Sequence, residues 1–574
     1  MSSVQQVDLI VVGSGAGGLS TAVVAKKRGL NVVVLEKAPV FGGTTAFSGG
    51  VLWIPGNSVS KAAGVHDTKD AALEYMKNET GEYFNEAAVD LFLEKGPEMV
   101  DFFQQNTTVQ FIPTLYPDYH PTVPGGVDIG RSILAKPFDI RELGKEKERL
   151  RPPLETITFI GMMFNSSNAD LKHFFNATKS LRSFIYVVKR LANHIKELAL
   201  YKRGVHVTSG NALAARLAKS AFDLGIPILT STAVVELIEG QEGIAGVRTQ
   251  GAEGEKIILA KHGVVLAAGG FPHDKERLKH AFPHVQRGGT HHSPAPIDNT
   301  GDGVRLAESV GADFQVKYPS AAAWMPVSLP PLSGGRQGVF PHLLDRYKPG
   351  VVGVNRYGQR FTNESESYHD VGAAMIKDGA QGQQTEMWLI CDQKTMSKYG
   401  LGYAKPAPMP LGGLIKSGYL LKGQTLADLA LQCGINAQRL EQTIAEYNVG
   451  AKQGKDTQFQ RGETSFNRYL ADPEHQPNPC VAPVEQGPFY AVHVLMGDLG
   501  TFDGIQTSVT GEALRSDGTI IPNLYVVGND RASIMGGNYP GAGITLGPIL
   551  TFGYVTANAI ADKAQQAKGD HCAN

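Results

Sequence analysis

The sequence predicts an α/β fold in three parts: a parallel sheet assembled from separate stretches of chain, an inserted α+β domain, and a basic, amphipathic helical insertion. Three observations carry this prediction. A glycine-rich turn joins two apolar runs near the start of the chain, a period-two region ends in a further apolar run at 264–267, and a glycine-rich segment at 536–548 opens a last helical pattern. At 574 residues the chain is too long for one hydrophobic core.

The first element is a strand–turn–helix–strand unit at 7–37. Apolar residues 9–12 lead into Gly13-x-Gly15-x-x-Gly18, and a second apolar run ends at Glu36. Gly13 permits the tight turn, Gly15 lets the backbone approach a pyrophosphate, and Gly18 lets the helix pack on the sheet. Glu36 stands where a carboxylate can accept hydrogen bonds from a ribose. The unit predicts a Rossmann-like dinucleotide site formed by Gly13, Ser14, Gly15, Ala16, Gly17, Gly18, Glu36 and Lys37.

A second glycine-rich loop follows at 41–50. Its small residues and hydroxyls offer N–H and O–H donors to phosphates and to a flat polar ring, which a fold that binds only a nicotinamide cofactor does not need. The loop therefore favours FAD over NAD, with contacts from Gly43, Thr44, Thr45, Ser48, Gly49 and Gly50.

Later stretches return the chain to the first sheet. The period-two region from 233 to 269 predicts a β-meander whose last strand rejoins that sheet. Residues 299–303 predict the start of a helix at 304–310, with Thr300 or Asp302 satisfying its first N–H groups.

Two of these motifs resemble a known superfamily. The segments GSGAGGLS and GGTTAFSGGVLWIPGN are similar to those of the fumarate reductase and 3-ketosteroid dehydrogenase flavoproteins, and the second is closer to the ketosteroid branch. The resemblance implies non-covalent FAD, because no histidine lies between Gly42 and Trp53, where some members tether the flavin. It also implies cofactor contacts at Ala233, Val234, Ala268, Gly269, Gly528, Asn529, Thr545 and Leu546.

Two tyrosines in separate loops match active-site positions of the 3-ketosteroid Δ1-dehydrogenases. Tyr119 lies in a loop rich in proline and glycine that resembles the one carrying their first active-site tyrosine. Tyr368 follows a segment at 360–364 that resembles the family's RFxNE and matches the proposed base, although Ser367 replaces the proline of many relatives. Taken without the resemblance, a loop tyrosine is more often a packing or surface residue.

The last glycine-rich segment supplies the other half of the implied site. Tyr539 and Gly543 match the pair that holds a 3-keto oxygen by a phenol O–H and a backbone N–H, which is an oxyanion hole for an enolate. The resemblance implies that Tyr368 takes the C2 proton, that Tyr119 relays it, and that FAD accepts the C1 hydride. A helix beginning here would direct its dipole at the flavin. The implied partners are a steroid and an external, quinone-like electron acceptor.

Residues 144–204 differ in composition from their surroundings. Lysines and arginines open the segment, an apolar patch follows at 157–164, and a helical pattern then forms an apolar stripe within a basic surround. The stripe is Leu181, Ile185, Val188, Leu191, Ile195 and Leu198, and the cations are Lys179, Arg182, Lys189, Arg190, Lys196, Lys202 and Arg203. Two readings stay open: the stripe packs on the parent domain, as most do, or it lies in a membrane interface.

These motifs set the expected domain boundaries and location. We expect an FAD-binding domain at 1–143, 205–285 and 488–574, the helical insertion at 144–204, and a substrate domain at 286–487. A net charge of −1 and a pI near 7 argue against a nucleic-acid partner. Four scattered cysteines indicate a reducing compartment and no metal site. Because residues 1–6 are too short and polar for a secretory signal, we expect a cytoplasmic protein, with peripheral contact at the inner membrane face as the second reading of the stripe.

Three other functions stay open. A fumarate or enoate reductase would clamp a dicarboxylate with arginines and histidines, and no arginine-rich cluster occupies the family position. A 3-ketosteroid Δ4-(5α)-dehydrogenase would use another tyrosine, for which Tyr490 is the candidate. A flavin-binding sensor or membrane-associated carrier would not need three tyrosines in matched loops. We therefore expect FAD-dependent 1,2-desaturation of 3-ketosteroids in steroid catabolism.

Overall fold

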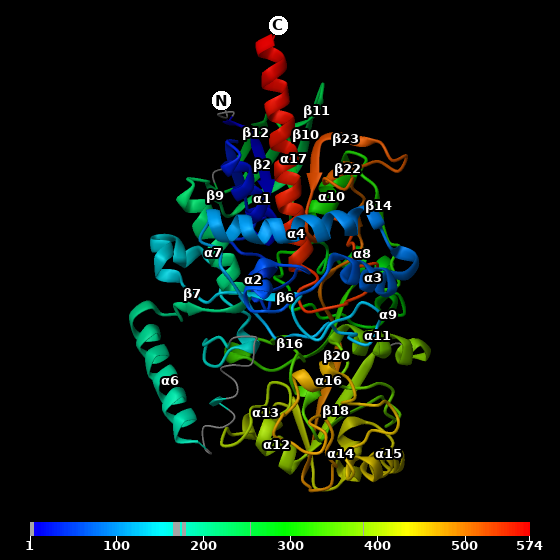
Figure 1. Ribbon diagram of the computed structural model, residues 1–574. Helices are drawn as coiled ribbons and strands as arrows, with labels where there is room; N and C mark the ends of the chain where they lie inside the picture. The colour runs from blue at the N-terminus through cyan, green and yellow to red at the C-terminus, as the bar shows by residue number, and fades with distance from the viewer. Residues whose placement is uncertain (1–4, 165–172, 175–179, 253, 383, 574) are drawn as a thin grey trace.

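The computed structural model describes residues 5–164, 173–174, 180–252, 254–382 and 384–573, and its upper half is built on a six-stranded sheet (Figure 1). The strand order is β22-β23-β13-β2-β3-β9, with only β22 antiparallel to its neighbour. Its central strands are fully buried apolar runs, as expected for a parallel sheet covered on both faces. The strands are β2 (Leu9–Val12), β3 (Val32–Leu35), β9 (Ile228–Leu229), β13 (Val264–Leu266), β22 (Glu512–Leu514) and β23 (Ile520–Val526).

Helix α1 packs against two other helices beside this sheet. The three helices are α1 (Ala16–Lys27), α7 (Ser209–Asp223) and α17 (Leu546–Ala573). A Cβ on Gly553 of α17 would lie 2.2 Å from the Ser20 hydroxyl of α1, so the two helices touch through backbone. The predicted C-terminal helix is confirmed, and it closes over the unit that begins the chain (Figure 1).

The predicted β-meander is also confirmed. β10 (Thr232–Gly240), β11 (Gly243–Gly251) and β12 (Gly254–Ala260) pair antiparallel, and β1 (Gln5–Val7) adds a parallel edge strand. β13 then enters the six-stranded sheet between β2 and β23. The sheet is therefore discontinuous in sequence.

A second large sheet forms the lower half of the molecule (Figure 1). Its order is β16-β15-β20-β18-β17, with β19 also paired to β20. The predicted boundary at 487 separates β20 from this sheet, but β20 pairs with both β15 and β18, and nearly all of its residues are buried between them. The strands and helices here are β15 (Ala322–Ser328), β16 (Phe340–Pro341), β17 (Val351–Val354), α11 (Tyr368–Asp378), β18 (Glu386–Asp392), α12 (Gln393–Tyr399), α13 (Gly412–Lys416), β19 (Leu420–Gly423), α14 (Leu426–Cys433), α15 (Ala437–Ala451), α16 (Ser465–Tyr469) and β20 (Phe489–Thr501).

Shorter elements join the two halves. The sheet β4-β6-β5 lies beneath α4, and buried Trp53 at its edge donates its indole N–H to Asp118 at 2.8 Å. Asp118 also pairs with buried Arg131 at 2.7 Å, which fixes the chain just before Tyr119. These elements are β4 (Val51–Trp53), α2 (Ser58–Ala62), α3 (Lys69–Thr80), α4 (Glu86–Asn106), β5 (Phe111–Pro113), β6 (Ser132–Ala135), β7 (Phe138–Asp139), β8 (His206–Val207), α8 (Lys275–Ala281), α9 (Pro283–Gln286), α10 (Asp302–Ser309), β14 (Phe314–Gln315) and β21 (Gly504–Ile505).

The predicted helix in the insertion is present as α6 (Leu181–Tyr201), which stands at the edge of the molecule (Figure 1). Lys179 and most of 165–179 lie outside the described residues. Among the described helices, none combines the length and apolar character needed to cross a bilayer.

Candidate active site

The turn after β2 brings backbone to the edge of a cleft. Gly13 has a φ of 107°, and a Cβ there would lie 2.2 Å from the Ala267 carbonyl at the end of β13. A Cβ on Gly18 would lie 1.9 Å from the Gly13 carbonyl, so Gly18 serves the packing of α1 on the turn. A Cβ on Gly15 meets only the Thr45 hydroxyl, at 3.7 Å. The N-terminus of α1 is therefore accessible to a phosphate, whose charge its N–H groups and dipole favour.

Glu36 at the end of β3 is held rigidly. One carboxylate oxygen accepts from the Ser14 N–H at 3.1 Å and the Ser14 hydroxyl at 2.5 Å, and the other accepts from the Ala38 N–H at 2.8 Å. The oxygen bonded to Ala38 keeps a free lone pair, which suits a ribose hydroxyl.

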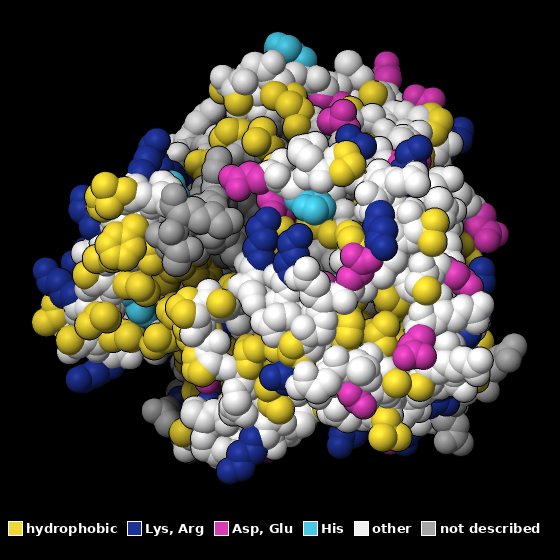
Figure 2. Space-filling view, turned by 90° about the horizontal axis from the view of Figure 1, so that it is seen from below, with side chains coloured by type: hydrophobic (Ala, Val, Ile, Leu, Met, Phe, Trp, Pro, Cys, Tyr) yellow, Lys and Arg dark blue, Asp and Glu magenta, His cyan; other side chains and the backbone are white. Residues whose placement is uncertain are grey.

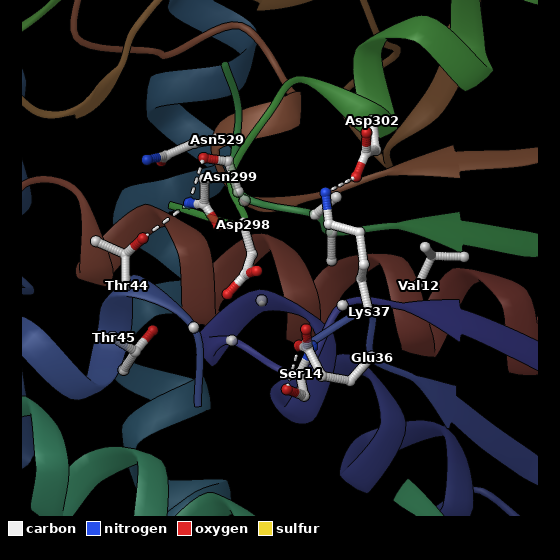
Figure 3. Close-up of a pocket in the computed structure, with 18 of the residues that line it drawn as sticks. Val12, Ser14, Glu36, Lys37, Thr44, Thr45, Asp298, Asn299, Asp302 and Asn529 are labelled. Carbon is white, nitrogen blue, oxygen red and sulfur yellow. Dashed lines mark hydrogen bonds and ion pairs between the residues drawn. The ribbon is translucent and has the colours of Figure 1, made fainter. Parts of the chain in front are cut away.

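The second glycine-rich loop lies against the first. The Thr45 hydroxyl accepts from the Ala16 N–H at 3.0 Å, and the Asn299 amide donates to the Thr44 hydroxyl at 2.9 Å (Figure 3). Asn299 therefore ties the segment before α10 to the loop before β4. All three segments face the same cleft.

The residues before α10 do not cap it. α10 begins at Asp302 after Gly301, and Gly301 has no side chain to cap the helix. Instead the Thr300 hydroxyl accepts from the Lys37 ammonium at 2.8 Å. Asp302 pairs with the same ammonium (Figure 3). The predicted capping role of Thr300 or Asp302 is wrong, because Lys37 after β3 attracts both oxygens.

The cleft has an empty volume of about 890 Å³. Most of the predicted cofactor residues line it: Gly13, Ser14, Gly15, Ala16, Gly17, Glu36, Lys37, Gly43, Thr44, Thr45, Val234, Ala268, Gly269, Gly528 and Asn529. Thr545 instead lines a smaller cavity that shares Gly528, Asn529 and Ile549 with the cleft. Residues from β2, β3, β10 and the segment after β23 thus meet at one place.

Other predicted cofactor residues are absent from the described lining: Gly18, Ser48, Gly49, Gly50, Ala233 and Leu546. Ala233 points away because successive side chains of a strand face opposite sides, and its neighbours Thr232 and Val234 face the cleft. The Ser48 hydroxyl donates to the Thr45 carbonyl at 2.8 Å, and a Cβ on Gly50 would meet Ser209 at 2.2 Å. Within the described structure these two residues shape the loop.

The cleft also contains residues that the sequence analysis did not assign to the cofactor: Arg151, Thr232, Asp298, Asn299, Asp302, Leu306 and Ile549. Arg151 pairs with Asp298 at 3.2 Å, but its buried Nε lacks a hydrogen-bond partner among the described residues. A buried, partly unsatisfied guanidinium suits an anionic group. Two sequence features could have indicated these residues. The motif at 299–303 was interpreted as a helix cap, and the charge run ending at Arg151 was assigned to the insertion.

The three predicted tyrosines meet in the interior. The Tyr119 hydroxyl donates to the Tyr368 hydroxyl at 3.2 Å. The ring of Tyr539 stacks on Tyr119 with centroids 5.5 Å apart and meets Tyr368 edge-on at 5.0 Å. All three side chains are at most 8% exposed. Segments far apart in the sequence therefore present three phenols to one buried point.

Burial makes the phenols hard to ionise. It raises the pKa of Tyr368 well above its ordinary value, and neighbouring Tyr119 and Tyr539 raise it further. Burial likewise raises the pKa of Tyr119 and of Tyr539. In contrast, burial lowers the pKa of His369 to about 4, so this imidazole is neutral at pH 7. The resting cluster is therefore uncharged.

Local bonds fix Tyr368 at the first position of α11. The Ser367 hydroxyl caps the helix by accepting from the Asp370 N–H at 3.1 Å, so serine here serves as an N-cap. Asp370 also bonds His120 at 3.0 Å, which ties α11 to the residue after Tyr119. Burial lowers the pKa of His120, but its bonds to Asp370 and Glu79 raise that pKa to about 11 overall. An ion pair thus holds the two tyrosine segments together.

A buried polar network supports the loop before Tyr368. Arg360 binds Glu364 through two hydrogen bonds of 2.8 Å and binds Asp456 on its other side. Arg461 donates to the Ser365 hydroxyl at 2.8 Å. These arginines are committed to the protein itself, which leaves them unsuited to clamping a dicarboxylate.

Gly543 lies three residues before the start of α17. Its φ is 95°, and a Cβ would come within 2.5 Å of the Val51 carbonyl. Its carbonyl accepts from Trp53, and none of the described residues accepts a backbone hydrogen bond from its N–H. Thr545, two residues later, lies 3.4 Å from the Tyr539 hydroxyl. Within the described structure, the segment therefore has an N–H without an acceptor four residues after Tyr539 and two residues before Thr545.

Tyr490 lies elsewhere. It stands near the start of β20 and donates to Gln393 at 2.7 Å. Thr501 at the other end of β20 lines the cavity beside the cleft. Eleven residues of extended strand separate the two, or roughly 36 Å. The structure does not bring Tyr490 to the other tyrosines.

Comparison with known proteins agrees with the geometry. The profile of the family described as FAD binding domain matches residues 8–546. The chain belongs to this FAD-binding family. FAD is its cofactor, and the chain is an FAD-dependent oxidoreductase acting on CH–CH bonds.

Similar proteins are dehydrogenases. A 4-oxocyclohex-2-ene-1-carboxylate 5-dehydrogenase of Sinomonas cyclohexanicum is 42% identical over 96% of this chain and 93% of its own. A 3-oxosteroid 1-dehydrogenase of Mycolicibacterium smegmatis is 36% identical over 98% of this chain and 99% of its own. The crystal structure of 3-ketosteroid delta1-dehydrogenase from Sterolibacterium denitrificans, in complex with 1,4-androstadiene-3,17-dione, matches with a TM-score of 0.88 and 34% identity, over 97% of this chain and 100% of that one.

Proposed function

We propose that this FAD-dependent enzyme removes two hydrogens from neighbouring ring carbons of a cyclic ketone, one of them next to the carbonyl. The observation that carries the proposal is the meeting of three buried phenols, one of which, Tyr539, precedes by four residues a Gly543 N–H that has no acceptor among the described residues. This set has the parts that such a reaction needs: donors for a ketone oxygen and a group that takes the adjacent proton.

Each residue has a distinct task in this proposal. The Tyr539 O–H and the Gly543 N–H bind the ketone oxygen and stabilise the enolate that forms when the adjacent carbon loses its proton. Tyr368 takes that proton as a phenolate, while Tyr119 donates a hydrogen bond to it and relays the proton outward. FAD, when bound, supplies the hydride acceptor. The chain's own part is to orient the ketone and to exclude water from the phenols.

The first candidate substrate is a 3-ketosteroid, desaturated at C1–C2 as a step of steroid catabolism. Support comes from the similarity to 3-oxosteroid 1-dehydrogenases over nearly the full chain. The position of Tyr490, bonded to Gln393 at the far end of β20, argues against desaturation at C4–C5 through that residue. An external, quinone-like acceptor would complete turnover.

A second candidate is a small oxo-acid, and two observations favour it. The relative named for a 4-oxocyclohexene carboxylate is 42% identical, against 36% for the steroid enzyme of M. smegmatis. Arg531 lines the cavity that also contains Phe502 and Thr545, both of which contact Tyr539. Burial lowers the pKa of Arg531 to about 10, so it stays charged at pH 7, and its buried Nη1 is unbonded within the described structure.

Anaerobic mixing of the FAD-loaded protein with each ketone tests the proposal. Androst-4-ene-3,17-dione and 4-oxocyclohex-2-ene-1-carboxylate are compared by the rate of flavin bleaching and by the position of the new double bond. Bleaching with either ketone, and a new double bond next to the carbonyl, supports the reaction. Flavin that stays oxidised with both ketones would overturn it.

Arg531→Met separates the two candidates. If a carboxylate pairs with Arg531, the substitution lowers kcat/KM for the oxo-acid about a hundredfold, because a charge-assisted hydrogen bond is lost, and leaves the steroid rate unchanged. Arg531→Lys is the control and retains part of the oxo-acid activity. Equal loss with both ketones would assign Arg531 to packing on Phe552, whose ring lies 3.9 Å from its guanidinium carbon.

A further inference from the structure

Helix α6 exposes its apolar face to solvent and buries polar side chains, which is the reverse of an ordinary surface helix. Its buried side chains are polar: Ser183, His194 and Glu197. Its exposed side chains include large apolar ones, at 47 to 75% exposure: Leu181, Phe184, Ile185, Val188, Ile195 and Leu200. Four of the six residues of the predicted stripe are thus exposed, and Leu191 and Leu198 are half-buried. The reading in which this stripe packs on the parent domain is wrong.

Hydrogen bonds on the inner face of α6 fix this orientation. His194 bonds the Ile160 carbonyl at 2.9 Å. Glu197 accepts from the Val205 N–H at 2.9 Å and contacts the His206 ring. Turning the apolar face toward the protein would break these bonds and would leave Glu197 without its partners, which is costly for a carboxylate. The exposed apolar face is therefore the folded state of this segment.

Residues Leu181, Ile185, Val188 and Ile195 share one side because they are spaced by four, three and seven positions. We call this side, with Phe184, the outer face. Its neighbours Arg182, Lys189 and Lys196 are exposed cations. Arg190 and Arg203 differ, because they donate to backbone carbonyls of the protein. Figure 2 shows hydrophobic side chains gathered at the left, with lysine and arginine along the rim.

We propose that the outer face of α6 docks on the surface of a bilayer that contains anionic lipid. The apolar side chains would enter the boundary between headgroups and acyl chains, and Arg182, Lys189 and Lys196 would contact lipid phosphates and carboxylates. The helix would lie flat, since its 21 residues span about 32 Å along the surface. Docking needs no substrate, so it stands independently of the ketone that the enzyme uses.

Charge favours a bilayer over a second copy of the chain. Glu197 is the only acidic residue of α6, and it is buried on the inner face. A symmetric dimer through the outer face would place the same cations of both copies against each other. Like charges facing across an interface oppose association, whereas an anionic membrane attracts them.

Vesicle flotation with the FAD-loaded full chain tests the proposal. Wild-type protein is mixed with vesicles of phosphatidylcholine alone or with added phosphatidylserine, and the bound fraction is measured. One variant carries Arg182→Glu, Lys189→Glu and Lys196→Glu, and a second carries Ile185→Asn, Val188→Asn and Ile195→Asn. Because each cation near an anionic surface contributes about fivefold in binding, loss of the three cations should weaken binding at least about a hundredfold, and the added glutamates should weaken it further. The apolar variant should lose binding to both kinds of vesicle.

Matched controls change equally exposed residues elsewhere. Leu431→Asn with Val449→Asn removes side chains that are 82% and 70% exposed on the lower half. Lys77→Glu, Lys275→Glu and Lys377→Glu reverse three exposed cations away from α6. Both controls should bind as wild type does, and retained flavin colour shows that every variant is folded. The proposal would be overturned if the wild-type protein stays unbound on anionic vesicles, or if the two α6 variants bind as the controls do. It would also be overturned if the wild-type protein binds no vesicles but forms a dimer that only the apolar variant loses.

Discussion

The FAD cleft and the tyrosine cluster are built in opposite ways. The shape of the cleft depends on glycine positions where a Cβ does not fit, such as Gly13 against the Ala267 carbonyl. The cluster presents side chains, and its members Tyr119 and Tyr368 come from segments 249 residues apart. The cleft depends on glycines that lack a side chain. The cluster depends on the neighbouring contacts that hold each tyrosine side chain in place.

This difference separates the expected effects of substitution. A substitution in the cleft should change folding or FAD affinity. An added side chain there meets either the backbone of the turn or the space that the cofactor occupies. A change in the cluster acts on rate and leaves FAD bound, because the phenols belong to other elements.

The largest effect is expected at Tyr368. Tyr368→Phe removes the proposed base but keeps the ring that packs edge-on against Tyr539. We expect flavin reduction by the substrate to slow about 10³-fold, the usual contribution of a positioned acid or base. Single-turnover flavin bleaching measures this rate.

Bound FAD is the control for Tyr368→Phe. Its content per chain and the thermal midpoint should match wild type, because the aromatic packing is conserved. A variant that reduces its flavin at the wild-type rate would remove Tyr368 from the role of base.

Two glycines of one motif sharpen the comparison. Gly13→Ala places a Cβ at a φ of 107° and 2.2 Å from backbone, so we expect a loss of about 3 kcal/mol in the free energy of unfolding of the FAD-free protein. Gly15→Ala meets only the Thr45 hydroxyl at 3.7 Å, so FAD-free stability should be unchanged while FAD binds more weakly. Denaturant unfolding and FAD titration measure the two properties. Equal behaviour of the two variants would contradict the roles assigned here.

The same contrast decides what the sequence could predict. Continuous motifs such as Gly13-x-Gly15-x-x-Gly18 gave the fold and much of the cleft lining, because local spacing sets a strand–turn–helix unit. Arg151 and Asp298 were missed as cleft residues, because only tertiary packing brings them beside Gly15. The tyrosines were found through resemblance, since a phenol in a loop has no periodicity that reports its neighbours.

The hydrophobic spacing of the sequence also could not predict that the apolar face of α6 points away from the protein. Hydrophobic spacing located the stripe but could not say which side it faces. That side is set by bonds of His194 and Glu197 to Ile160 and Val205, segments that do not belong to the helix.

The pH dependence follows from the burial of the phenols. Burial raises the pKa of Tyr368 above its ordinary value of about 10, so the phenolate is a minor form at neutral pH. Below that pKa its fraction rises about tenfold per pH unit, and kcat/KM should rise equally from about pH 6 to 9. The residual activity of Tyr368→Phe should lack this slope. A flat wild-type profile would contradict the assignment.

The smallest effect is expected at Tyr119, whose hydroxyl donates to Tyr368 at 3.2 Å but has no proposed contact with the ketone. Tyr119→Phe breaks the proposed relay that carries the proton away from Tyr368, so we expect kcat to fall about tenfold while KM stays the same. Because neighbouring Tyr119 raises the pKa of Tyr368, loss of its hydroxyl should also move the rise of the pH profile to lower pH. A purely structural role would lower FAD content or stability without moving the profile, and that outcome would remove Tyr119 from the proton path. The ring still packs on Phe466 and Tyr539 in the variant, so the pH shift reports the hydroxyl alone.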